Sequence, residues 1–94
     1  MKQCEKCGKY IDESFETAYG EIRCPDCYDD YLLTDKGKVE YLIGIVRGDY
    51  PMDYYDADFL GLVAVCWNTY KDKLALTAKE INDIEIKAMM FGLI

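Results

Sequence analysis

The sequence predicts a small α+β fold in which a compact N-terminal segment, residues 1–33, packs on a cluster of three or four α-helices, residues 34–94. Three observations lead to this prediction. Four of the five cysteines form two Cys-x-x-Cys pairs within residues 4–27, three later segments have helical spacing of apolar residues, and 94 residues suffice for one compact domain. The joint "TDKG", residues 34–37, is short. We therefore expect the two parts to dock as one unit.

The two cysteine pairs, Cys4 with Cys7 and Cys24 with Cys27, predict a metal site. They are separated by 16 residues, a spacing typical of four-cysteine zinc sites. Each pair forms a tight turn that directs two sulfurs to one point, and four thiolates then surround one Zn²⁺ at about 2.3 Å. Gly8 suits a turn with positive φ whose N–H groups point at sulfur. We expect one structural zinc ion held by all four cysteines.

The residues between and after the pairs predict a hairpin and the start of a helix. "TAYGEIR", residues 17–23, alternates in part and contains a glycine, which indicates a β-hairpin. In "CPDCYDDYLL", residues 24–33, Pro25 and Asp26 suit a first helical turn. A knuckle, a hairpin and a second pair that opens a helix resemble the treble-clef and LIM-like zinc ribbons. The resemblance covers about the first third of the chain and is specific for metal rather than for function.

Other roles for the cysteines are less consistent with the sequence. A thioredoxin-type pair normally stands alone on a βαβ unit, and an iron–sulfur cluster also uses four cysteines, although two symmetric knuckles favour zinc. Catalytic zinc commonly uses histidine and keeps an open position, whereas this chain has no histidine. Without histidine or a glycine-rich phosphate loop, we expect no enzymatic activity and no small-molecule substrate. The fifth cysteine, Cys66, is interpreted as a small buried hydrophobe.

Two helices are predicted after the joint. Residues 36–48, "KGKVEYLIGIVRG", carry apolar residues at i, i+3, i+4 and i+7. Residues 55–74, "YDADFLGLVAVCWNTYKDKL", begin a second helix at Asp56 or Asp58 as N-cap. The stretch "FLGLVAVCW" is apolar on nearly every face, so we expect this helix to be the most buried one.

A third helix is predicted in residues 77–94, "TAKEINDIEIKAMMFGLI". Thr77 and Glu80 form a capping box at its start. The residues expected along its buried face are Ile81, Ile84, Ala88 and Phe91.

The charge pattern disfavours direct binding of nucleic acid. Net charge is −7, from 18 acids and 11 bases, and a phosphate backbone repels such a chain unless its bases are clustered. Four thiolates on Zn²⁺ would add about −2 more. No apolar run approaches the roughly 20 residues of a membrane span, and the start of the chain lacks the apolar core of a signal peptide. We expect a cytoplasmic protein that does not associate with membranes.

The stretch "GDYPMDYYDADF", residues 48–59, is the candidate surface for a protein partner. Tyrosines offer contact area at low entropic cost, and aspartates attract a basic partner. The candidate binding residues are Asp49, Tyr50, Asp53, Tyr54, Tyr55, Asp56 and Asp58. The alternative is an ordinary loop in which aspartates cap a helix and tyrosines pack on the core.

The overall profile, "CEKC…CPDC" at the head of a short acidic helical chain without a catalytic histidine, resembles zinc-containing anti-CRISPR proteins. The resemblance implies a phage-encoded, non-enzymatic inhibitor in the host cytoplasm. It would bind a type II CRISPR effector nuclease, a basic protein that handles nucleic acid, and hinder loading of target DNA. The alternatives are a zinc-ribbon transcription regulator of the anti-sigma type, a nucleic-acid-binding zinc ribbon, and a host adaptor.

Overall fold

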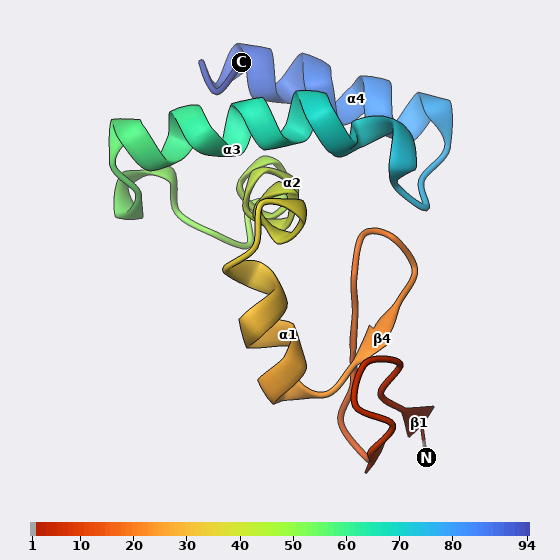
Figure 1. Ribbon diagram of the computed structural model, residues 1–94. Helices are drawn as coiled ribbons and strands as arrows, with labels where there is room; N and C mark the ends of the chain where they lie inside the picture. Colours follow the sequence, from red (N-terminus) through yellow and green to blue (C-terminus); the bar gives the residue numbers. More distant parts are fainter. Residues whose placement is uncertain (1) are drawn as a thin grey trace.

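The computed structural model describes residues 2–94, and over this range two short antiparallel hairpins precede four α-helices (Figure 1), which confirms the small α+β fold. The strands are β1 (Lys2–Gln3), β2 (Tyr10–Ile11), β3 (Phe15–Glu16) and β4 (Ile22–Arg23). The α-helices are α1 (Pro25–Leu32), α2 (Val39–Arg47), α3 (Ala57–Tyr70) and α4 (Ala78–Met90). Three 3-10 helices adjoin them: η1 (Lys36–Lys38), η2 (Met52–Tyr54) and η3 (Lys71–Lys73).

The N-terminal segment is built from two hairpins of two residue pairs each. β1 pairs with β2, with Lys2 opposite Ile11, and β3 pairs with β4, with Phe15 opposite Arg23. The N–H of Glu5 donates to the carbonyl of Ile22 at 2.8 Å and joins the two hairpins. Hairpins this short are unstable alone in water. The segment therefore depends on other contacts for its shape.

The joint between the N-terminal segment and the helices is a closely packed turn. The Thr34 hydroxyl donates to the carbonyl of Tyr31 at 2.6 Å, and the Gly37 N–H donates to the Thr34 hydroxyl oxygen at 3.1 Å. Gly37 is buried against the Tyr31 carbonyl, and any side chain there would overlap it. Residues 34–37 thus fix the path from α1 into η1.

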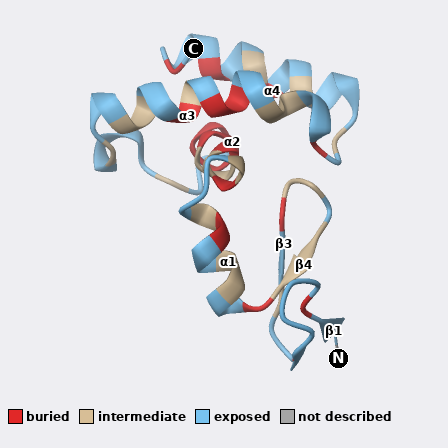
Figure 2. Cartoon of the chain, in the orientation of Figure 1, coloured by how far each residue is buried: buried red, intermediate tan, exposed pale blue. Residues whose placement is uncertain are grey.

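The most buried helix is α2, and the expectation that residues 55–74 would be the most buried is wrong. The buried residues of α2 are Val39, Leu42, Ile43, Gly44, Ile45 and Val46. In α3 only Val63, Cys66 and Trp67 are buried, whereas Val65 is 62% exposed. The reason is the layering: α3 and α4 cover one side of α2, and α1 lies on its other side (Figures 1 and 2). Cys66 is buried as expected, and burial raises the pKa of its thiol.

Both predicted helix starts are confirmed. The Asp56 carboxylate accepts a hydrogen bond from the Phe59 N–H at 2.7 Å, which makes Asp56 the N-cap of α3. The Thr77 hydroxyl oxygen accepts from the Glu80 N–H at 3.2 Å at the start of α4. No helix within residues 2–94 is long and apolar enough to span a membrane.

The end of α4 differs from the expected pattern, because Phe91 is exposed rather than buried. Gly92, with φ 76°, reverses the chain, and the Leu93 N–H donates to the Ala88 carbonyl at 2.8 Å. This left-handed C-terminal turn places Leu93 in the core instead of Phe91.

Candidate metal centre

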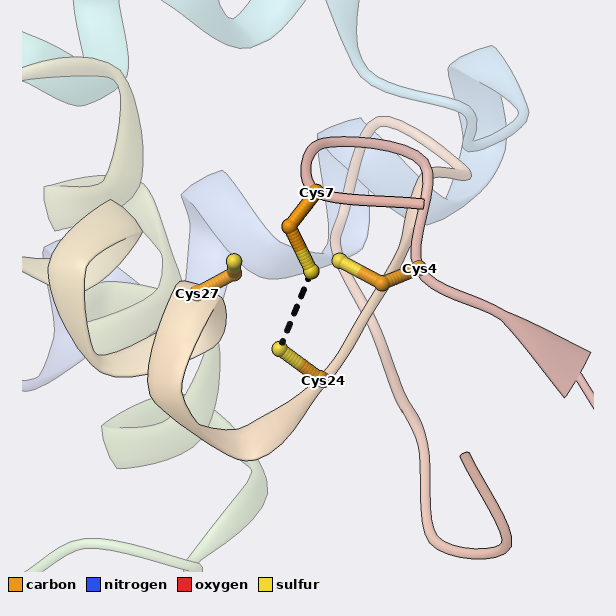
Figure 3. A group of neighbouring side chains, drawn as sticks. All are labelled: Cys4, Cys7, Cys24 and Cys27. Atoms are coloured by element: carbon orange, nitrogen blue, oxygen red, sulfur yellow. Dashed lines mark hydrogen bonds between the residues drawn. The ribbon is translucent and has the colours of Figure 1, made fainter. Parts of the chain in front are cut away.

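Two separate elements bring the four predicted cysteines together (Figure 3). Cys4 and Cys7 lie on the knuckle between β1 and β2, and Cys24 and Cys27 lie at the start of α1. All four sulfur atoms lie within 4.8 Å of one another, and the Sγ atoms of Cys7 and Cys24 are 3.8 Å apart. The structure therefore assembles every residue of the predicted metal site.

Local backbone geometry explains how each pair directs two sulfurs to one point. In the knuckle, Gly8 has φ 76°, and its N–H donates to the carbonyl of Cys4 at 2.9 Å. The side-chain-free residue permits this left-handed turn. At the second pair, Cys24 is the extended N-cap of α1 and Pro25 occupies the first turn, so Cys27 lies one turn further along the same side of the helix.

The donor set fits one tetrahedral zinc ion. With zinc–sulfur bonds of about 2.3 Å, tetrahedral geometry separates the sulfurs by about 3.8 Å. The Cys7–Cys24 separation of 3.8 Å has this value, and the remaining separations do not exceed 4.8 Å. Cys4 is 1% exposed and Cys24 is also buried, so one side of the site is shielded from water. Four thiolates complete a tetrahedral shell, which is typical of a structural site.

Without a metal, the four thiols would not ionise alike. The backbone N–H groups of Cys7 and Cys24, followed by that of Lys6, lower the pKa of Cys4 to about 6. Hydrogen bonding with Cys24, together with desolvation, raises the pKa of Cys27 to about 12. A metal ion requires all four as thiolates, so binding at neutral pH releases protons.

The hairpin next to the metal site is hydrogen-bonded to the helices through Glu40, a residue that the sequence analysis did not single out. Glu40 Oε1 accepts from the Ala18 N–H at 2.6 Å and from the Tyr31 hydroxyl at 2.8 Å. The Ala18 carbonyl in turn accepts from the Ala75 N–H at 2.8 Å. Burial raises the pKa of Glu40. The one indication in the sequence is an acid three residues before buried Ile43, on a flank of the apolar face.

The predicted partner-binding residues divide into two groups. The four aspartates of residues 48–59 are exposed, and the Tyr54 side chain is 79% exposed. Tyr50 and Tyr55 are half-buried, with ring centroids 5.9 and 5.4 Å from that of Tyr41. Asp56 also caps α3. The segment therefore combines core-packed tyrosines with an exposed acidic edge.

No protein-family model, curated protein or solved structure matches this chain. Its class is therefore defined by its own fold and site. The chain is a small α+β protein with four cysteines positioned to hold one metal ion, an arrangement consistent with a zinc ribbon.

Proposed function

We propose that the chain is a non-enzymatic, zinc-stabilised inhibitor that binds a basic, nucleic-acid-handling protein. The target proposed first is a type II CRISPR effector nuclease. The observation that carries the proposal is an acidic surface without bases. Residues 24–35 and 48–70 contain eight aspartates and neither lysine nor arginine. A surface of this charge attracts a protein whose own groove is lined with lysine and arginine.

Aromatic packing supports this surface. Tyr55 stacks on Phe59 with ring centroids 5.1 Å apart, and Tyr41 meets Phe59 edge to face at 5.1 Å. Tyr54 lies against Tyr55 and extends into solvent. Burial and then the neighbouring Tyr50 and Asp29 raise the pKa of Tyr41, so α1 contributes to the same acidic environment. A partner would meet rings and carboxylates that are already held in place, which lowers the entropic cost of binding.

The proposed mechanism is stoichiometric competition. A CRISPR effector holds its guide–target heteroduplex in a positively charged channel through backbone contacts. An acidic protein seated in or beside that channel would exclude target DNA by occupying groups that contact phosphate. In this mechanism the zinc ion has no chemical step, and it holds the hairpins and the start of α1 in a fixed relation.

Target-DNA binding by a guide-loaded type II effector, measured with and without an equimolar amount of the zinc-loaded protein, tests the proposal. We expect loss of DNA binding and of cleavage. The informative variant is Asp49→Lys with Asp53→Lys, which reverses two exposed charges outside any helix cap. It should relieve inhibition while zinc content and helicity stay normal. The matched control, Asp72→Lys with Asp83→Lys, makes the same change in net charge elsewhere and should still inhibit.

Capture experiments separate the alternatives. Binding to RNA polymerase holoenzyme, without an effect on the nuclease, would replace the proposal with a regulator of the anti-sigma type. Direct binding of labelled DNA that falls steeply with salt would favour a nucleic-acid-binding ribbon. Unchanged nuclease activity at saturating protein would refute the proposed target.

A further inference from the structure

The side of α3 and α4 that faces away from α2 is apolar and exposed. Val65 lies two residues from both Val63 and Trp67, which are buried, so it is on the opposite side of α3. Ile86 stands in the same relation to buried Ile84 and Ala88 in α4. Two exposed methionines, Met89 and Met90, adjoin Ile86 along α4.

The two helices present this side together. Trp67 Nε1 donates to Glu85 Oε1 at 3.3 Å, and Lys71 pairs with the same carboxylate at 2.5 Å, so α3 and α4 are in contact along their length (Figure 1). We call the surface the outer face. Its residues are Gly61, Val65, Asn68, Asn82, Ile86, Met89 and Met90. None of these residues carries a charge.

The composition of α3 is not explained by the contacts within one chain. A helix that is apolar on nearly every face is normally buried on every face. Here only one side of α3 is buried, and Val65 is exposed beside apolar residues of α4. A contiguous apolar surface of this kind normally marks an interaction site.

The distribution of charge indicates what covers it. Residues 1–56 carry thirteen acids and seven bases, whereas residues 57–94 carry five acids and four bases. The outer face also points away from α1 and from the metal-binding hairpins (Figure 1). Two copies that meet through their outer faces would keep their acidic parts apart, so the net charge of −7 on each chain opposes the contact least in this orientation.

The available area fits a small but specific interface. Helices of 14 and 13 residues are each about 20 Å long and pack about 10 Å apart, which gives a footprint of about 20 by 20 Å. Two such surfaces are close to the lower limit of about 1,000 Å² of total burial for a specific contact. Because a two-fold contact pairs the same patch on both copies, an uncharged apolar patch is self-complementary.

We propose that this protein forms a two-fold homodimer through the outer face of α3 and α4. Sedimentation of the zinc-loaded protein under reducing conditions, over a dilution series, measures the association directly. We expect a mass of twice 10.9 kDa at high concentration and dissociation on dilution. In protein labelled at the methionine methyl groups, the NMR signals of Met89 and Met90 should shift on dilution, whereas that of Met52, in η2, should not.

Substitutions locate the contact. Val65→Glu and Met89→Glu should each raise the dissociation constant at least about tenfold, because each buries two like charges at a symmetric interface. The matched control is Leu33→Glu, the same type of substitution at an exposed leucine just after α1. It should leave the dissociation constant unchanged, and circular dichroism and metal content should confirm folding of all three variants. A wild-type protein that stays monomeric at every concentration overturns the proposal, and so does a dimer weakened equally by Leu33→Glu.

Discussion

Replacing Glu40 by alanine should destabilise the whole fold, whereas replacing it by glutamine should not. The Glu40 carboxylate accepts hydrogen bonds from the Ala18 N–H and the Tyr31 hydroxyl, which belong to the N-terminal segment. Glutamine keeps a carbonyl oxygen that can accept both bonds. Alanine leaves both donors without this partner.

The size of the effect follows from the surroundings of each donor. An unsatisfied buried donor costs about 1–3 kcal/mol. Tyr31 is buried, so its hydroxyl should be near the upper end of this range. Ala18 and Glu40 line a cleft of about 250 Å³ with Ile43 and Arg47, so water can replace the lost acceptor and the cost there should be smaller. We expect Glu40→Ala to lower the free energy of unfolding by about 2–4 kcal/mol.

Urea titration monitored by the fluorescence of Trp67, which is fully buried, measures this change. A pH series tests the charge. Burial raises the pKa of Glu40 above its unfolded value, so the stabilising effect of its proton is fully present below about pH 4.3 and is lost as pH rises through the folded-state pKa. Glu40→Gln does not titrate, and its stability relative to wild type should therefore increase over that interval.

Two results would refute this reasoning. If Glu40→Ala unfolds at the same urea concentration as wild type, the hydrogen bonds to Ala18 and Tyr31 contribute nothing. If Glu40→Gln is destabilised as much as Glu40→Ala at neutral pH, the negative charge rather than the acceptor holds the two parts together.

Three further outcomes are expected. Chelation of the metal, at one ion per chain, should lower the melting temperature of the helical part as well, and unchanged helical melting would contradict the coupling. Gly44→Ala should destabilise by about 1–3 kcal/mol because a methyl group would overlap the Tyr50 ring. Gly61→Ala, in open space within α3, should stabilise by about 0.5–1 kcal/mol, and urea titration of both should give opposite signs. Lys71 holds the pKa of Glu85 below its usual value, so the stability from this pair should be present above about pH 4.3 and lost as pH falls; a Glu85→Gln variant that loses stability just as steeply would argue against it.

The metal site could be predicted completely from the sequence because its information is local. Each cysteine pair needs only a tight turn, and the glycine and proline beside the pairs supply the required backbone. The N-caps Asp56 and Thr77 were equally predictable, since each bonds to an N–H three residues on. These features depend on a few neighbouring residues.

Burial could not be ranked from the sequence, because it depends on which elements lie on either side of a helix. Residues 59–67 are more uniformly apolar than α2, yet α2 is covered from both sides and α3 from one. The packing of Tyr50 was equally hidden. Its ring lies against Gly44, where the absence of a side chain leaves room for it, and no periodic pattern records such a fit.

The two backbone bonds of Ala18 have a consequence for how this protein can change during evolution. Its N–H donates to Glu40 and its carbonyl accepts from Ala75, so one residue at the hairpin ties it to two separate places on the helices. Two of the three groups involved at Ala18 and Ala75 belong to the main chain, which every amino acid except proline can supply in full. Many substitutions at these positions would preserve the connection, so descendants of this chain could keep the same architecture while retaining little recognisable sequence beyond the cysteines.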